Sequence, residues 1–360
     1  MEFNYSNKGI MVINMKKRIS DFAILGDSEK YLYFTSEKNN LLIVISKDGF
    51  NLVKVFCLPD ENMDSGCLVG SVVETNRGVV LAPRNAKKIW ILNNESFSGI
   101  DINEYVSEKC NHKFLSSAKY NNHVFLFGHF FPGIIGIDIE TLTVDYVYKV
   151  PEEIINLKED GDCPGFAKQS CIVDNCIYLA YVNSSCVVKF DMESMTTSWI
   201  DINDNEGEAF GLSKDIGGKG FWISKRDSKG MLLWDGTGNV IDEYINNFSP
   251  RINMGVCTLK NKILLPNYNQ RSYLYDVNRN NWEEDDEIYS FLDTELYYYF
   301  VKYDNLVIYN KSTDEEEVVR IDLDELDSYC DDLLKTSKFR IGMIYEGDPF
   351  SLEGYINSIR

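Results

Sequence analysis

The sequence predicts an all-β protein made of seven copies of one four-stranded antiparallel unit. Apolar strands occur in pairs joined by a polar turn, and each pair closes on Asp, Asn or Ser. The strands are rich in Val, Ile, Phe and Tyr and the turns in Asn, Gly and Pro, as β-propensity and turn chemistry require. Successive closing residues are 47, 45, 53, 44, 41 and 34 positions apart. They are Ser46, Asn93, Asp138, Asp191, Asp235, Asp276 and Asn310.

A period near 45 residues is typical of the blades of a β-propeller. One copy contains the complete unit, with strands predicted at Phe114–Tyr120, His123–Phe127, Ile134–Asp138 and Val144–Lys149 and no helix between them. Such a sheet cannot bury both faces alone, so neighbouring copies must pack against it. The seven strand pairs are Tyr31–Ser46, Gly78–Asn93, His123–Asp138, Cys176–Asp191, Gly220–Asp235, Lys262–Asp276 and Leu296–Asn310.

The two ends of the chain complete the predicted single domain over residues 1–360. The last interval is short and its first strand, Tyr289–Leu292, is poorly defined, so six blades with a modified end piece are the alternative to seven. Within residues 1–20, the isolated apolar segment Gly9–Met15 is expected to complete the final blade and close the ring. Residues 321–360 form an extension with one or two short helices, predicted at Asp322–Leu334 and after Asp348.

The blade-closing segments resemble those of the Kelch-like branch of the β-propellers. Tyr275-Asp276 is followed by Trp282, and Phe190-Asp191 is followed by Trp199, as in the Tyr-Asp, turn, Trp signature of that branch. Ile137-Asp138, followed by Tyr146, is a third example. The Gly-Gly pair of Kelch repeats is absent from every copy. The resemblance covers residues 21–320 and implies the fold but no activity, because propellers serve unrelated functions.

Charge limits the classes of partner. The formal net charge of −20 makes binding of nucleic acid unfavourable. Between Glu283 and Asp332 there are eighteen acidic and three basic residues, so this stretch carries −15 of the −20. We interpret it as a solvated face with acidic turns; the alternative is a negative flank that steers a basic partner.

No apolar run has the length or order of a signal peptide or a membrane span. Several of the nine cysteines lie inside apolar strands, where a free thiol behaves as a small hydrophobic group. We therefore expect a cytoplasmic monomer that binds no membrane.

The predicted ligand site is the ring of turns between the second and third strands of the blades. These turns share one end of the ring with the loops that arrive from the preceding blade, and basic residues gather in them although the protein is acidic. Such a rim is suited to an anionic ligand, because guanidinium groups bind carboxylate and phosphate in a bidentate manner. The alternative is that exposed turns carry Lys and Arg only for solubility. The predicted binding residues are Arg84, Lys87, His129, Lys225, Arg226, Tyr268 and Arg271.

Two functions are compatible with this rim. The preferred one is a non-enzymatic propeller that recognises a peptide, a protein partner or a small anionic ligand. The alternative is a lyase or hydrolase acting on a carbohydrate or other polar metabolite, with His129, Tyr268 and Glu37 as candidate catalytic residues. No His and Cys spacing fits a metal site and no glycine-rich phosphate motif is present, so we expect neither metal nor cofactor.

Overall fold

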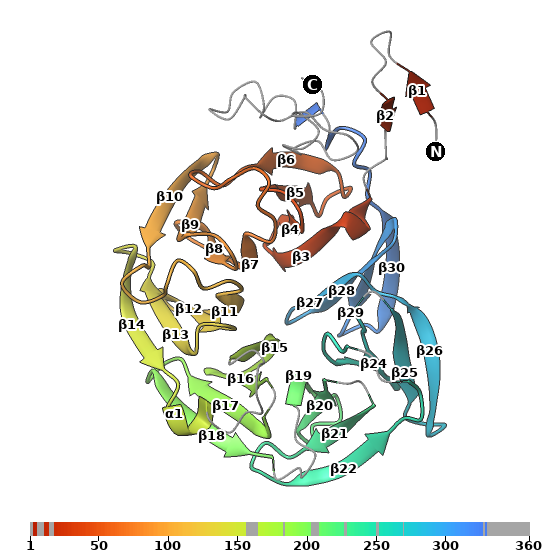
Figure 1. Cartoon of the computed structure of the whole chain (residues 1–360). Helices are drawn as coiled ribbons and strands as arrows, with labels where there is room; N and C mark the ends of the chain where they lie inside the picture. Colours follow the sequence, from red (N-terminus) through yellow and green to blue (C-terminus); the bar gives the residue numbers. More distant parts are fainter. Residues whose placement is uncertain are drawn as a thin grey trace.

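Seven four-stranded antiparallel sheets form a closed ring in the computed structural model (Figure 1). The structure describes residues 3–5, 11–13, 18–155, 165–182, 184–202, 209–226, 229–249, 252–268, 270–326 and 328–329. The seven-bladed β-propeller is therefore confirmed, and the six-bladed alternative is wrong. Helical structure in these ranges is limited to a four-residue helix, α1 (Glu152–Ile155), a single 3₁₀ turn, η1 (Ile19–Asp21), and helical residues at Leu326, Ser328 and Tyr329.

Each blade takes its four strands from one continuous stretch of chain, in the order in which they occur. Blade 1 consists of β3 (Phe22–Asp27), β4 (Tyr31–Ser36), β5 (Leu42–Ser46) and β6 (Leu52–Phe56). Blade 2 consists of β7 (Val69–Thr75), β8 (Gly78–Pro83), β9 (Lys88–Asn93) and β10 (Ser96–Asp101). Blade 3 consists of β11 (Phe114–Tyr120), β12 (His123–Gly128), β13 (Gly133–Asp138) and β14 (Thr143–Lys149).

Blades 4 to 7 repeat this order. Blade 4 consists of β15 (Phe166–Val173), β16 (Cys176–Tyr181), β17 (Cys186–Asp191) and β18 (Thr196–Asp201). Blade 5 consists of β19 (Ala209–Lys214), β20 (Phe221–Lys225), β21 (Gly230–Trp234) and β22 (Val240–Ile245). Blade 6 consists of β23 (Cys257–Leu259), β24 (Lys262–Leu265), β25 (Arg271–Asp276) and β26 (Asn281–Glu287). Blade 7 consists of β27 (Ser290–Asp293), β28 (Tyr297–Lys302), β29 (Asn305–Asn310) and β30 (Glu315–Arg320).

The apolar residues of the predicted strand pairs form seven separate cores, one between each pair of neighbouring blades. The core that closes the ring packs Ile24 and Phe34 of blade 1 against Tyr299 and Val301 of blade 7. All four side chains are almost completely buried. Because every sheet is covered on both faces in this way, a single blade has no stable existence outside the ring.

The repeated closing residue has a structural role, because it holds the turn between the third and fourth strands. In blade 3, Asp138 Oδ1 accepts hydrogen bonds from the backbone N–H groups of Glu140 (2.7 Å) and Thr141 (2.9 Å). Asp276 and Asn310 accept equivalent bonds in blades 6 and 7. Side chains of Asp and Asn favour such turns because they accept bonds from the backbone just ahead of them. The repeated Asp, Asn or Ser is therefore explained by its hydrogen bonds to the turn and does not indicate a ligand site.

The ring closes without the N-terminal segment, so that prediction was wrong. Within Gly9–Met15 the structure describes β2 (Met11–Ile13), which pairs with β1 (Phe3–Tyr5) in a two-stranded sheet of its own. Blade 7 already has four strands, and its core against blade 1 is complete.

The described part of the predicted C-terminal extension ends at Tyr329. Leu323 and Leu326 are buried in the core between blades 7 and 1, and the N–H of Tyr329 donates to the carbonyl of Glu325 (3.2 Å), as in a helical turn. The remainder of the helix predicted at Asp322–Leu334, and the second helix after Asp348, lie outside the described residues.

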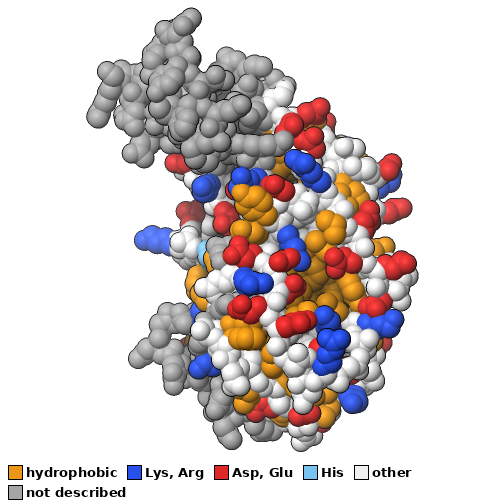
Figure 2. Space-filling model, turned by 90° about the vertical axis from the view of Figure 1, so that its right-hand side faces the viewer, with side chains coloured by type: hydrophobic (Ala, Val, Ile, Leu, Met, Phe, Trp, Pro, Cys, Tyr) orange, Lys and Arg blue, Asp and Glu red, His pale blue; other side chains and the backbone are white. Residues whose placement is uncertain are grey.

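The outer strands carry much of the acidic stretch and face solvent. Figure 2, which views the side where β26 and β30 lie in Figure 1, shows acidic, basic and apolar side chains interspersed. On β26, Glu283 and Asp286 form ion pairs with Lys262 (3.1 Å) and Lys302 (3.6 Å). This arrangement agrees with our interpretation of the stretch as a solvated face. None of the described helices is long and apolar enough to cross a membrane.

Candidate ligand site in the central channel

The innermost strands of blades 1 to 5 each contain a break in register with the second strand. The breaks lie between Ile24 and Gly26, Val69 and Ser71, Phe114 and Ser116, Phe166 and Ser170, and Ala209 and Gly211. A β-bulge leaves a residue outside the ladder and changes the direction of neighbouring side chains. The channel wall is therefore set by these bulges and not by strict alternation along the strands.

The irregularity in β15 is the widest of the five. Phe166 pairs with Tyr181 and Ser170 with Leu179, so the three residues from Ala167 to Gln169 lie opposite Ala180 alone. This excess of residues on β15 brings the polar side chains of Lys168 and Gln169 to the channel.

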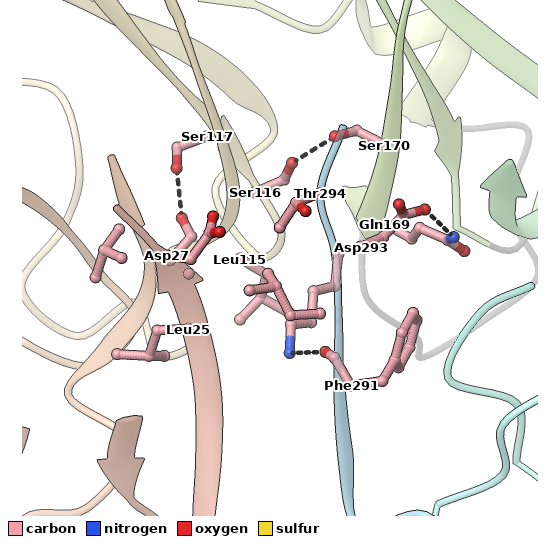
Figure 3. Close-up of a pocket in the computed structure, with 15 residues that line it drawn as sticks. Leu25, Asp27, Leu115, Ser116, Ser117, Gln169, Ser170, Phe291, Asp293 and Thr294 are labelled. Atoms are coloured by element: carbon pink, nitrogen blue, oxygen red, sulfur yellow. Dashed lines mark hydrogen bonds between the residues drawn. The ribbon is translucent and has the colours of Figure 1, made fainter. Parts of the chain in front are cut away.

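A cavity of about 180 Å³ lies where these side chains meet the innermost strands of blades 1, 2, 3 and 7 (Figure 3). One buried water needs about 10–15 Å³ on a comparable measure, so the cavity has room for a small organic molecule. Figure 3 shows Ser116, Ser117 and Ser170 grouped at one end of this cavity and Leu25 and Phe291 at the other. The channel site therefore has a hydroxyl-rich end and an apolar end.

Lys168 spans the channel from blade 4 towards blades 1 and 7. Its Nζ donates to the carbonyls of Ile24 and Phe291, both at 3.5 Å, which is the long limit for a hydrogen bond. No carboxylate in the described ranges lies within ion-pair distance of it. Burial, and after it the positive charge of Arg84, lowers the pKa of Lys168 to about 8, partly offset by Glu37. The positive charge of the Lys168 ammonium group is thus only weakly balanced by negative charge from the described residues.

Arg84 supplies a second weakly compensated cation. It follows β8, and its backbone is fixed because its N–H donates to the carbonyl of Leu68 (2.8 Å) and its carbonyl accepts from the N–H of Lys113 (2.7 Å). The Nη2 atom lies 3.5 Å from Nε2 of His112, and the buried Nε atom has no hydrogen-bond partner among the described residues. Burial, and then the charge of Arg84, lowers the pKa of His112. Arg84 therefore adds positive potential near Lys168 and keeps one donor unused.

Gln169 and Asp293 fill the channel between blades 4, 6 and 7. Gln169 Nε2 donates to the carbonyl of Val256 (2.6 Å) and to Asp293 Oδ2 (2.8 Å), and Oε1 accepts from the N–H of Val256 (2.9 Å). The other oxygen of Asp293 accepts from Lys311 Nζ. Burial raises the pKa of Asp293, and the bonds from Lys311 and Gln169 oppose this effect. Both carboxylate oxygens are therefore occupied, so Asp293 is not available as a general base in this arrangement.

The serines of the site bond to one another. Ser117 Oγ donates to Ser71 Oγ (2.8 Å), and Ser116 Oγ donates to Ser170 Oγ (3.3 Å). A serine nucleophile needs an adjacent base, and these bonds join hydroxyl groups only. The hydroxyl-rich end is therefore equipped to donate and accept hydrogen bonds to a polar ligand.

The structure places two of the predicted rim residues against acidic side chains of outer strands. Lys225 Nζ donates to Glu243 Oε1 on β22 (2.5 Å), and Arg271 Nη1 lies 3.7 Å from Glu284 Oε2 on β26. Their charges are thus balanced within their own blades, away from the innermost strands.

The remaining predicted residues occupy separate positions on the rim. Lys87 Nζ donates to the carbonyl of Asp60 (2.9 Å), and His129 Nδ1 donates to the carbonyl of Phe166 (2.9 Å). Arg226 accepts at its carbonyl from the N–H of Asn253 (2.9 Å). Tyr268 and Glu37 are exposed. Of the predicted set, Arg84 is the residue whose charge acts on the channel lysine.

The central residues Lys168, Gln169 and Asp293 were not predicted, because the predicted site consisted of turns alone. A usable signal was present: Lys168 and Gln169 interrupt the first strand of blade 4, in a position where the other blades carry small or apolar residues. The innermost strand of a blade borders the channel, so a charged side chain on that strand is expected to face the channel.

His123, Asp138 and Asp145 form the group in the described chain that has the composition of a metal site, with ligand atoms within 4.8 Å of one another. His123 Nε2 lies 2.7 Å from Asp145 Oδ2, and Asp138 holds the turn described above. These hydrogen bonds within the hairpins of blade 3 account for the grouping, and no metal ion is needed to explain it.

The fold and its channel define the class: this chain is a seven-bladed β-propeller whose central cavity has a hydroxyl-rich end and an apolar end. No protein-family model and no curated protein sequence matches it. A streptogramin B lyase structure is similar, with 13% identity, a TM-score of 0.59, and 81% of this chain and 93% of the other chain covered.

Two further structures are similar. BamB from Moraxella catarrhalis has 13% identity and a TM-score of 0.52, with 77% of this chain and 80% of that chain covered. The C-terminal WD40 domain of Sif2 has 10% identity and a TM-score of 0.52, with 84% and 85% covered. Similarity at these identities supports the propeller fold, which is used by binding domains and by enzymes alike.

Proposed function

We propose that this protein is a binding propeller whose channel receives a small anionic ligand between Lys168 and Arg84. The observation that carries the proposal is the ammonium group of Lys168, held in the channel by two carbonyl contacts of 3.5 Å and by no described carboxylate. A partly buried cation without a counter-ion is costly, and a bound carboxylate or phosphate removes much of that cost.

Binding is favoured over catalysis by the state of the groups in the channel. Asp293 is bonded at both oxygens, and the serines are bonded to other serines. The candidate catalytic residues Glu37, His129 and Tyr268 lie on different blades; His129 bonds to a backbone carbonyl, and the other two lie at the surface. No observation favours the lyase or hydrolase alternative over a binding role.

The predictions of a cytoplasmic monomer that binds neither nucleic acid nor membrane and carries no cofactor are kept as part of this proposal. The net charge of −20 supports the exclusion of nucleic acid. The resemblance to Kelch-like propellers also stays a prediction. It rests on the Tyr-Asp, turn, Trp pattern, in which the rings of Tyr275 and Trp282 pack with their centroids 5.0 Å apart.

The test is a thermal-shift screen at pH 7 with succinate, citrate, glutamate, inorganic phosphate and a phosphate monoester, followed by calorimetric titration of the best ligand. We expect at least one anion to raise the melting temperature, Lys168→Met to abolish the shift and Lys168→Arg to retain part of it. Lys262→Met is the matched control, because Lys262 pairs with Glu283 on an outer strand (3.1 Å). Equal binding of the anions by wild type and Lys168→Met would refute the proposal.

A further inference from the structure

A second, larger cavity lies at the opposite end of the channel. It has a volume of about 830 Å³ and shares Ser117, Ser170, Asp293 and Thr294 with the channel site. Its other walls come from the turns between the first and second strands of blades 4, 5 and 7. In an antiparallel meander these turns lie at the other end of the strands from the turns that carry Arg84 and Lys87. We call this cavity the chamber.

The mouth of the chamber is apolar. Ile172 and Ile216 line it and are 51% and 58% exposed, and Leu296, beside the lining residue Glu295, is 55% exposed. These three aliphatic side chains come from three different blades, 4, 5 and 7. Large aliphatic side chains exposed together around a concavity are typical of a surface that contacts another chain.

The chamber is also acidic. Of its four carboxylates, Asp293 is paired with Lys311, and Asp215 accepts hydrogen bonds from Trp222 Nε1 (2.9 Å) and from the N–H of Lys219 (3.0 Å). Asp174 and Glu295 form no ion pair with the described residues, while Lys214 is the one lining cation outside the Lys311 pair. The electrostatic potential in the chamber is therefore negative and attracts a positively charged group. The net charge of −20 acts in the same direction.

We infer that the chamber mouth is a docking surface for a protein segment that carries one Arg or Lys flanked by aliphatic side chains. The basic side chain enters the chamber towards Asp174 and Glu295, and the flanking side chains pack on Ile172, Ile216 and Leu296. Central aromatic or Arg anchors in a pocket, surrounded by apolar contacts that exclude water, are the usual source of affinity in such interfaces.

The test uses fluorescein-labelled, end-blocked peptides of sequence Ser-Leu-Arg-Leu-Ser, with citrulline or glutamate replacing arginine in the matched pair. Binding to the full-length protein is measured by fluorescence anisotropy. We expect the arginine peptide to bind at least tenfold more tightly than the citrulline peptide and the glutamate peptide to bind most weakly.

Two sets of variants locate the site. Asp174→Asn combined with Glu295→Gln removes the charges without changing shape, and Asn also tolerates the positive φ of 55° at position 174. Ile172→Ser combined with Ile216→Ser removes the apolar contacts. Each pair is expected to weaken the arginine peptide at least tenfold. Ile245→Ser, on the outer strand β22 and 62% exposed, is the matched control and should have no effect.

Three outcomes would overturn the inference. They are no binding by any of the peptides, equal binding of the arginine and glutamate peptides, and an equal loss of affinity for the arginine peptide in the control variant and the chamber variants. Binding of arginine amide as tightly as the peptide would also overturn it, in favour of a small-cation site. Lys168→Met should leave peptide binding unchanged, so failure of the anion proposal and failure of this one are distinguishable.

Discussion

Replacing Lys168 by Met should stabilise the protein at neutral pH, which is the reverse of the usual effect of changing a partly buried residue. The pKa of Lys168 falls from 10.5 to about 8 on folding. Because the folded pKa is the lower one, the folded state disfavours the charged form, and the cost is fully present below pH 8. A difference of this size corresponds to about 3 kcal/mol at pH 7 and to less than about 1 kcal/mol at pH 10.

Methionine removes the charge and also the two carbonyl contacts at 3.5 Å, which are worth about 0.5 kcal/mol each at most. We therefore expect the free energy of unfolding to rise by about 2 kcal/mol at pH 7, and by much less at pH 10. Urea denaturation followed by tryptophan fluorescence at the two pH values measures the difference. For Lys262→Met, which breaks an exposed ion pair, the change should stay within about 1 kcal/mol. Destabilisation of Lys168→Met at pH 7, or an equal change at both pH values, would refute the reasoning.

Three further predictions concern the ligand, the core and the turns. Calorimetric affinity for the anion should fall at least tenfold between pH 7 and pH 9.5, since Lys168, with a pKa of about 8, loses its proton over this range; a constant affinity would contradict the site. Phe34→Ala, in the core that closes the ring, should cost about 3–5 kcal/mol in urea denaturation, whereas Val318→Ala, exposed on β30, should stay within about 0.5 kcal/mol. Asn310→Ala removes three bonds that hold a blade turn and should cost about 1–2 kcal/mol by the same assay; no change would mean that the turn forms without its side chain.

The second and third strands of every blade could be predicted from the sequence because their two faces and their turns are specified locally. The predicted strand His123–Phe127, for example, ends one residue short of β12. The error at the N-terminus has an equally plain cause. An isolated apolar segment such as Met11–Ile13 can pair with any free edge, and its own residues do not say which, so its pairing with Phe3–Tyr5 was not foreseen.

The channel site was less predictable because it depends on irregularities. A bulge breaks the alternation on which the prediction of inward and outward faces relies, and the break in β15 is what brings Lys168 and Gln169 to the axis. The neutralisation of Lys225 on β20 by Glu243 on β22 depends in turn on the registers of both strands with β21, which lies between them. A sequence shows that both residues are charged, but the register decides whether they meet.

Strand β15 runs between the two proposed sites, and the charged residues at its two ends have opposite signs. Lys168 lies near its beginning, in reach of the charge of Arg84, while Asp174 follows its last residue at the mouth of the chamber. Six residues of extended chain separate the two positions, which at about 3.3 Å per residue places them about 15–20 Å apart once the bulge is allowed for. That separation is about twice the screening length at physiological salt, about 8 Å, although a partly buried charge such as that of Lys168 is screened less than an exposed one. The two proposed ligands, of opposite charge, therefore lie far enough apart to be bound at the same time, with the bonded pair of Gln169 and Asp293 between them.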